Sequence, residues 1–364
     1  MNNWLLIIGC WVLVIGCSAG SNQSLVAEMS QTPASTPSAT HGQPPTATPV
    51  KHSQPPTTSI HDKFAIIISG VGGEASYAKR FAQWAETLAE LLRRQLNFDD
   101  SRVFILSATP ELVAHANVKQ ATAEAVRATL AQIKSLASAH SLIFVFLIGH
   151  GAVDNNQAKF NLVGPDMTAE DFDRALDALP TEQVIFVNTA SASGAFINAL
   201  SQSGRIVITA TRSGQEQNAT MFAEFFIQAF KEHQADFDKN QRVSLLEAFT
   251  FATQAVERWY KEQDRLATEH ALLDDNGDKL GHRDARGGDG ALARTTYLDS
   301  PVPTQAAADP ELARLIADKE RLEQSIETLK ARKSQMDTAT YESELERLLI
   351  ELARISQAIK ARQQ

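Results

Sequence analysis

Five short apolar runs recur along the middle of the chain, and each is hydrophobic at nearly every position rather than at every second one. Strands that bury one face alternate apolar and polar residues, whereas strands covered on both faces do not. The pattern therefore predicts parallel strands inside a layered sheet. The predicted strands are residues 64–69, 102–108, 142–148, 183–187 and 205–210.

Helical spacing separates most of these strands. Apolar side chains repeat every three or four positions in residues 77–96, 121–138 and 168–179. Asp166 and Thr168 are candidate caps at the start of the last of these segments. Strand, helix and strand in repetition predict right-handed crossovers, so the expected fold class is α/β, a doubly wound and mostly parallel sheet. Ligands of such folds bind beyond the carboxyl ends of the strands, so a site is first sought there.

Small residues follow the third and fourth predicted strands. Gly149, His150 and Gly151 come directly after the third, and the segment VNTASASGAF carries small residues from Thr189 to Gly194 where the fourth gives way to a helix. This order and spacing resemble the caspase-like cysteine peptidases, legumain in particular, in which a His-Gly pair and a Cys-x-Ser-Gly segment end neighbouring strands. The resemblance covers about residues 62–285. It implies a caspase-like fold whose histidine loop holds His150 and Gly151.

The cysteine position of that family is occupied by Ser191 in this sequence. Both cysteines of the chain, Cys10 and Cys17, lie near its start, so no other thiol is available to the α/β region. A thiol becomes a thiolate with modest help, whereas a serine hydroxyl needs a base in hydrogen-bond contact and a group that orients this base. No residue that orients His150 is evident in the sequence. We therefore interpret His150, Gly151 and Ser191 as a degenerate peptidase site that binds protein or peptide.

Two other functions remain open. The first is an active serine-type endopeptidase that uses Ser191 and His150. The second is a structural envelope lipoprotein whose α/β domain is only a scaffold, because small residues and glycines also serve close packing and tight turns. A hydrogen bond between His150 and Ser191 would favour the serine peptidase. A cleft open to an extended peptide would argue against the scaffold.

An acidic segment in the second half, DFDKNQRVSLLE, matches the spacing of an EF-hand loop over residues 236–247. Oxygen ligands at positions 1, 3, 5, 7, 9 and 12 of such a loop bind calcium, so we expect Ca²⁺. Gln241 stands at the sixth position, where glycine makes the sharp turn, and this should weaken the affinity. The alternative is an acidic loop whose carboxylates cap the following helix. The expected ligands are Asp236, Asp238, Asn240, Arg242 through its carbonyl oxygen, Ser244 and Glu247.

Residues 1–17 have the features of a lipoprotein-type signal peptide, with an apolar stretch that ends in the letters VIGC. This ending resembles the bacterial lipobox, which implies that Cys17 is lipidated and becomes the N-terminus. We expect a protein anchored by lipid in the bacterial cell envelope. Ser18 favours the outer membrane, with the protein facing the periplasm or the cell surface. An uncleaved N-terminal anchor is the alternative, because no Lys or Arg precedes the apolar stretch.

The rest of the chain divides by composition. Residues 18–60 are rich in Ser, Thr, Pro and Gln, which predicts a disordered tether, and residues 61–303 are expected to form the α/β domain. Residues 304–364 repeat Leu and Ile at heptad spacing around a short polar connection, which predicts a helical hairpin or coiled coil. This hairpin either folds onto the α/β domain or serves self-association or partner association. The net charge of −9, without a basic stripe, argues against nucleic acid as a partner.

Overall fold

The computed structural model describes most of the chain from Asp62 onward. The predicted signal peptide (1–17) with Cys17 and the predicted tether (18–60) lie outside the described residues. Within the part that is described, no helix combines the length and the apolar character needed to cross a bilayer. The described residues are 62–115, 117–181, 183–231, 233–240, 242–285, 288–299, 309–331, 333 and 336–363.

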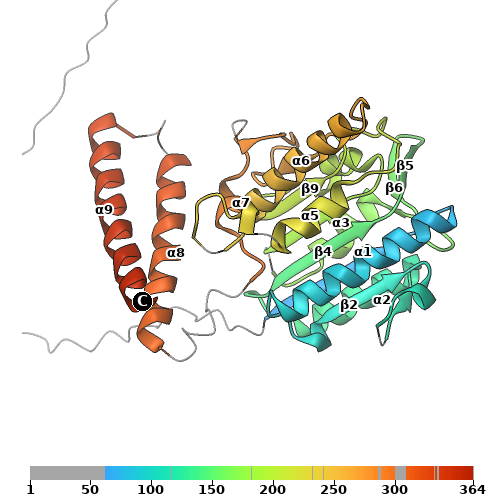
Figure 1. Ribbon diagram of the computed structural model, residues 1–364, viewed down its shortest axis with the longest axis horizontal. Coiled ribbons are helices and arrows are strands. Elements are labelled where there is room, and N and C mark those ends of the chain that lie inside the picture. Colours follow the sequence, from blue (N-terminus) through green and yellow to red (C-terminus); the bar gives the residue numbers. More distant parts are fainter. Residues whose placement is uncertain are drawn as a thin grey trace, which may run out of the picture. The chain divides into compact units, whose positions relative to one another are not determined.

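The centre of the fold is a seven-stranded sheet in the order β10-β9-β8-β4-β1-β2-β3 (Figure 1). Neighbouring strands are parallel except β10, which runs antiparallel to β9. All five predicted strands are present, which confirms the α/β class and the mostly parallel sheet. The strands are β1 Lys63–Ser69, β2 Val103–Ser107, β3 Lys119–Gln120, β4 Leu142–Ile148, β8 Val184–Asn188, β9 Arg205–Thr209 and β10 Leu272–Asp274.

Helices cover both faces of this sheet, which explains why its strands are apolar at nearly every position. One face, with Ala65 and Ile67, packs against α1, α5 and α6. The opposite face, with Phe64 and Ile66, packs against α2, α3 and α4. The helices are α1 Ala75–Arg94, α2 Ala123–Leu136, α3 Ala169–Asp177, α4 Ile197–Leu200, α5 Phe222–Lys231, α6 Leu245–Glu262 and α7 Ala291–Thr295, with 3-10 turns η1 Asp100–Arg102, η2 Pro110–Leu112, η3 Ser193–Phe196 and η4 His233–Ala235.

Only one of the two predicted caps acts on α3. The hydroxyl of Thr168 accepts from the backbone N–H of Asp171, whose carboxylate accepts in return from the N–H of Thr168. Asp166 is too far upstream to reach the helix. Its carboxylate turns back and accepts from the N–H of Leu162 at 3.0 Å, so the prediction that Asp166 caps the helix is wrong.

A small antiparallel sheet begins directly after His150. Its strands are β5 Gly151–Asp154, β6 Gln157–Phe160 and β7 Met167–Thr168, in the order β5-β6-β7. Asn155 and Asn156 make the two-residue turn between β5 and β6 with φ of 46° and 62°, values that Asn tolerates well. Strand β5 is thus an edge strand of this small sheet, and its first residue lies next to His150.

The C-terminal region contains the predicted pair of helices, α8 Pro310–Ala331 and α9 Thr338–Gln363. Ile326 of α8 clusters with Tyr341 near the start of α9, whereas Ile316 near the start of α8 clusters with Ile359 near the end of α9. These contacts make the hairpin antiparallel, with one apolar seam between its helices.

Candidate functional site

The carboxyl ends of β1, β4, β8 and β9 lie at one edge of the central sheet, because these strands are parallel. From β1 the chain first builds the sheet outward through β2 and β3, and it then returns to the other side of β1 with β4. The sheet therefore has its topological switch point between β1 and β4, where α/β folds bind their ligands. The loops that begin at Gly70 and Gly149 meet at this point, and the backbone N–H of Gly70 donates to Ile148.

His150 is held as an oriented and neutral side chain. Its ring makes edge contacts with Tyr77 and Phe81, at centroid distances of 5.1 Å and 5.2 Å. Burial lowers the pKa of His150, and a hydrogen bond to the backbone of Gly72 opposes this shift. An imidazole that donates to a carbonyl through one nitrogen keeps the other free as an acceptor. The lowered pKa thus favours the neutral ring, which can accept a hydrogen bond through its other nitrogen.

The group that orients His150 is a backbone group, which sequence reasoning missed. A Cβ on Gly72 would lie 2.5 Å from the backbone nitrogen of Ala78, so only glycine fits between β1 and α1. The detectable signal was the cluster of glycines from Gly70 to Gly73 directly after the first strand. Glycine is needed at such a position because another part of the backbone comes too close for a side chain.

Ser191 lies on the other side of the switch point, and its hydroxyl is bonded to Gly151. The hydroxyl accepts from the N–H of Gly151 at 3.1 Å and donates to the carbonyl of the same residue at 3.1 Å. Ser191 is 2% exposed. One edge of β5 pairs with β6, and the Ser191 hydroxyl lies at the other edge. There it bonds Gly151 in place of a further strand. Among the residues that the structure describes, no hydrogen bond joins Ser191 to His150.

This arrangement decides what the hydroxyl can do. A nucleophilic serine gives its proton to a base during attack, so its hydrogen must point toward that base. Here the hydrogen of Ser191 points to a carbonyl, which cannot take it. The N–H of Gly151, a donor of the kind that stabilises an oxyanion, is also already engaged by the same hydroxyl.

Ser193 and Gly194 join this loop to the end of β9. The hydroxyl of Ser193 accepts from the N–H groups of Ala210 and Thr211, both at 3.1 Å. Gly194 donates its N–H to the hydroxyl of Thr211 at 2.9 Å, and a Cβ on Gly194 would lie 2.3 Å from the carbonyl carbon of Arg212. The Ser-Gly pair of the motif therefore has a packing role in this chain.

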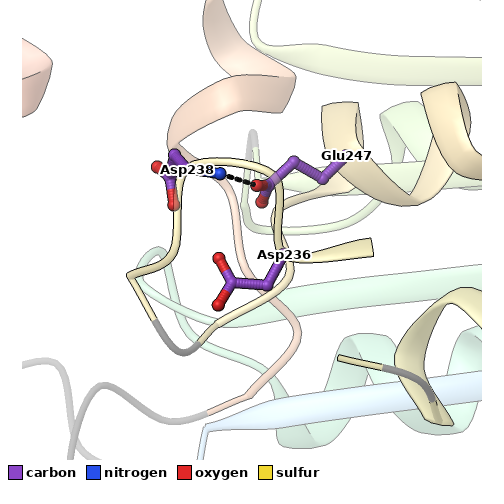
Figure 2. A group of neighbouring side chains, drawn as sticks. All are labelled: Asp236, Asp238 and Glu247. Atoms are coloured by element: carbon purple, nitrogen blue, oxygen red, sulfur yellow. Dashed lines mark hydrogen bonds between the residues drawn. The ribbon is translucent and has the colours of Figure 1, made fainter. Parts of the chain in front are cut away.

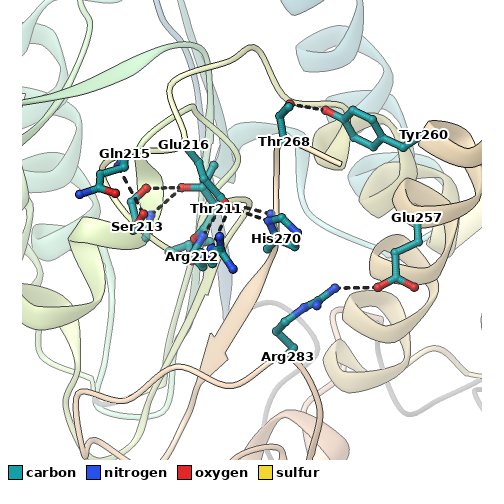
Figure 3. Close-up of polar contacts among 12 residues, drawn as sticks. Thr211, Arg212, Ser213, Gln215, Glu216, Glu257, Tyr260, Thr268, His270 and Arg283 are labelled. Atoms are coloured by element: carbon teal, nitrogen blue, oxygen red, sulfur yellow. Dashed lines mark hydrogen bonds and ion pairs between the residues drawn. The ribbon is translucent and has the colours of Figure 1, made fainter. Parts of the chain in front are cut away.

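A polar cluster continues the site along the loop after β9 (Figure 3). The carbonyl of Glu216 accepts from Ala192 of the Ser191 loop at 2.7 Å. Its carboxylate accepts from the backbone N–H groups of Arg212 and His270, contacts the His270 ring nitrogen at 2.5 Å and pairs with the Arg212 guanidinium at 3.1 Å. Glu216 and His270 are 54 positions apart, so no local sequence pattern pointed to this pair.

Glu269 fixes the other end of the same loop. Its carboxylate accepts from the N–H groups of Met221 and Phe222 and so caps the start of α5. Glu269 is 3% exposed, and burial raises its pKa to about 7. The adjacent residues 269 and 270 thus hold both ends of the loop after β9.

The predicted calcium loop lies away from this edge. The carboxylates of Asp236, Asp238 and Glu247 converge, with one oxygen of each within 4.8 Å of the others (Figure 2). Burial raises the pKa of Asp238, and the negative charge of Glu247 raises it further. Asn240 donates its N–H to both aspartates, at 3.0 Å each. Three of the six predicted ligands are therefore gathered, and a fourth is bonded to two of them.

The remaining calcium candidates have roles of their own. Ser244 caps α6 and shares a capping box with Glu247. The N–H of Arg242 donates to Asn240 at 2.8 Å, while its guanidinium pairs with Asp299 at 2.7 Å. Gln241, at the position that favours glycine, lies outside the described residues. The loop thus contains a carboxylate cluster and also a helix cap, the two features that the sequence offered as alternatives.

Comparison with protein-family models finds a match to the peptidase C13 family over residues 113–272. The matched segment runs from the residues before β3 to the first residue of β10, so it includes both the His150 loop and the Ser191 loop. Comparison with curated proteins finds no match. The family match confirms the resemblance to the legumain type of caspase-like peptidase for residues 113–272.

Proposed function

We propose that this chain, whose residues 113–272 form a peptidase C13 family domain, binds protein or peptide at its relic cleft without cutting it. The observation that carries the proposal is the hydrogen bonding of Ser191. Its hydroxyl is bonded to the N–H and the carbonyl of Gly151, so the serine contributes to the fold and has no base. His150 keeps an orientation suited to polar contact with a ligand.

Side chains around the switch point suit contact with a peptide. The Tyr77 and His150 rings are only half-buried, and the Arg212 side chain is 63% exposed. Aromatic faces and a guanidinium contact peptide side chains and carbonyls without any covalent step. Exposure of these groups next to the topological switch point favours a binding site over a closed scaffold.

The test uses residues 62–364, which contain every hydrophobic cluster described. The protein is incubated with a diverse peptide library, and mass spectrometry reads both cleaved peptides and peptides retained on the immobilised protein. We expect retention without cleavage. Cleavage that is lost in Ser191→Ala and His150→Ala would establish the alternative, an active serine-type endopeptidase. Neither cleavage nor retention would favour the alternative of a structural envelope scaffold.

A second proposal concerns calcium at residues 236–247. The supporting observation is the convergence of Asp236, Asp238 and Glu247, two of them buried. Carboxylate and carbonyl oxygens are the ligands that calcium prefers, and a cation would offset the repulsion between these carboxylates. Asn240, Ser244 and the carbonyl of Arg242 would complete the predicted set. Both oxygens of Glu247 already accept hydrogen bonds, from Phe237, Asp238 and Ser244, which agrees with a weak site.

Calorimetric titration with calcium tests this proposal. Wild-type residues 62–364 should bind one ion, and excess calcium should raise the melting temperature because the ion binds only the folded state. Glu247→Gln should abolish the binding heat. Glu257→Gln, an exposed change on the same helix α6, is the matched control and should leave it intact. Equal heats for both variants, or no heat in the wild type, would show that the carboxylates only cap the helix.

The membrane anchor remains a proposal based on the lipobox-like ending at Cys17. Lipidation there would place the domain in the bacterial cell envelope, on the outer membrane facing the periplasm or the cell surface. Cys17→Ser in the full chain should prevent incorporation of labelled palmitate and release the protein to the soluble fraction. Cys10→Ser is the matched control. A Cys17→Ser protein that stays with the membrane would instead support an uncleaved N-terminal anchor.

A further inference from the structure

Helix α9 has one apolar stripe, which faces α8, and beside it a second face that is apolar only at its centre. Tyr341, Leu345, Leu348 and Leu352 pack in the seam of the hairpin. The residues that directly follow these seam positions form a second series, with the same alternating spacing of four and three residues. Such spacing keeps residues on one narrow face of a helix. This set, the outer seam, consists of Glu342, Glu346, Leu349, Ala353, Ser356 and Lys360.

The middle of the outer seam is apolar and exposed. Leu349 is 47% exposed and its neighbour Ile350 is 46% exposed, and both are among the few large apolar side chains so exposed in the part of the chain that is described. They line a shallow groove together with Leu345, Ala353 and the acidic residues Glu342 and Glu346. Leu349 and Ile350 thus form a small exposed apolar area at the middle of a charged helix.

The charges of the outer seam indicate which partner fits. Its acidic residues, Glu342 and Glu346, lie in the first half of α9, and its basic residue, Lys360, lies near the end. A second α9 laid antiparallel would place Glu342 beside the partner's Lys360, twice by symmetry, whereas a parallel copy would place like charges together. Antiparallel helices also align their macrodipoles favourably.

The spacing agrees with such a two-fold arrangement. The outer seam is symmetric about Glu351, because residues 342 and 360, 346 and 356, and 349 and 353 are equally far from it. A two-fold axis there pairs Leu349 with the partner's Ala353, a large side chain against a small one. That pairing lets two helices approach closely and is self-complementary, as an isologous interface requires.

We propose that two copies of this chain associate through the outer seam of α9, antiparallel about a two-fold axis at Glu351. The inference goes beyond the proposed peptide binding and does not depend on it. The contact joins one pair of helices through a small apolar centre and two exposed ion pairs. Exposed ion pairs contribute little each, so the association is weak and depends on concentration.

Sedimentation velocity on residues 62–364 over a wide range of concentration tests the proposal. The wild type should show a reversible monomer–dimer equilibrium. Leu349→Glu should lower the association constant at least tenfold, since it buries a charge at the two-fold centre. Leu266→Glu is the matched control, because Leu266 is 90% exposed on the loop after α6 and lies outside the seam.

Charge exchange tests the orientation. Glu342→Lys and Lys360→Glu should each weaken self-association, and an equal mixture of the two variants should restore dimers, because the mixed pair is complementary. A parallel dimer would give no such restoration. A wild type that stays monomeric would overturn the proposal. So would a Leu349→Glu variant that still dimerises, or one whose melting temperature falls, because the seam would then pack within its own chain.

Discussion

The His150 loop and the Ser191 loop meet at one edge of the sheet, but their two side chains have different hydrogen-bond partners. His150 has an orienting hydrogen bond to Gly72, aromatic neighbours and a lowered pKa. The hydroxyl of Ser191 is bonded to both backbone groups of Gly151. A hydroxyl donates and accepts strongly, whereas a thiol does both weakly. The serine is thus suited to a structural bond that the cysteine of the family would make poorly.

This difference teaches that the residues of a catalytic motif can also be needed for packing. Ser193 and Gly194 match the family pattern, and their contacts with Thr211 and Arg212 explain why these residue types are needed. A sequence match at this loop therefore reports the fold. The proposal that this site is inactive rests on one position, Ser191, and on the partner of its hydroxyl.

Gly194→Ala should lower the free energy of unfolding most, because it disturbs the Ser191 loop and leaves the His150 loop unchanged. The added Cβ would lie 2.3 Å from a backbone carbon of Arg212. Either the Ser191 loop or the loop after β9 must therefore move. We expect a loss of about 3 kcal/mol or more in the free energy of unfolding, measured by urea denaturation. Gly73→Ala is the comparison, because its Cβ would meet open space and only its φ of 73° is strained, a cost of about 1 kcal/mol. Equal losses would contradict the packing role of Gly194.

Glu269, which caps α5, should make the stability of the protein depend on pH. Its pKa rises from 4.5 to about 7 on folding because the carboxyl is buried. The folded state therefore holds this proton more tightly than the unfolded state, and the free energy of unfolding should fall as pH rises from about 4.5 to about 7. The loss is on the order of 3 kcal/mol. Denaturation at several pH values should show this slope in the wild type, and a Glu269→Gln variant with an unchanged slope would refute it.

Ser191→Ala should destabilise the protein, because it leaves the N–H and the carbonyl of the buried Gly151 without a partner. The expected cost is about 2 kcal/mol in the free energy of unfolding. Ser135→Ala, on the exposed side of α2, is the matched control and should change little. A Ser191→Ala protein as stable as the wild type would mean that the hydroxyl is not needed by the fold.

His150 should show the smallest effect, with a sign opposite to that of Glu269. Its lowered pKa means that the unfolded state takes up the proton first, so His150 destabilises the fold as pH falls below about 6.5. Titration by NMR should give His150 a midpoint below this value. The midpoint of His282 should lie above it, because the Asp289 carboxylate raises the pKa of His282. Phe81→Ala should move the His150 midpoint upward by exposing the ring, and an unmoved midpoint would remove burial as the cause.

The sequence predicted the core of the fold but not its short elements. Continuous apolar runs mark a strand covered on both faces, so β1, β2, β4, β8 and β9 were detectable. Strands of two to four residues, such as β3 and β5 to β7, are too short to carry a period. Strand β10 has only three residues, and its antiparallel direction is set by its pairing with β9, which a local sequence pattern does not show.

The site was predictable where it consists of motif residues. His150 and Ser191 followed from the resemblance, and the structure brings their loops to one edge of the sheet. The carbonyl of Gly72 was not predictable, because a backbone group has no letter of its own. Glu216 and His270 were missed because their contact joins segments far apart in the chain. The central question, the partner of the Ser191 hydroxyl, depends on a local geometry that residue types leave open.

Labelling with a fluorophosphonate probe tests this point most directly, because such probes react with activated serines and not with ordinary ones. Residues 62–364 contain no cysteine, so the Ser191→Cys thiol with iodoacetamide reports whether a small reagent reaches the position. The account predicts no phosphonate adduct at Ser191 by intact mass and peptide mapping. An adduct at Ser191 that disappears in His150→Ala would show that the two residues act together and would contradict it.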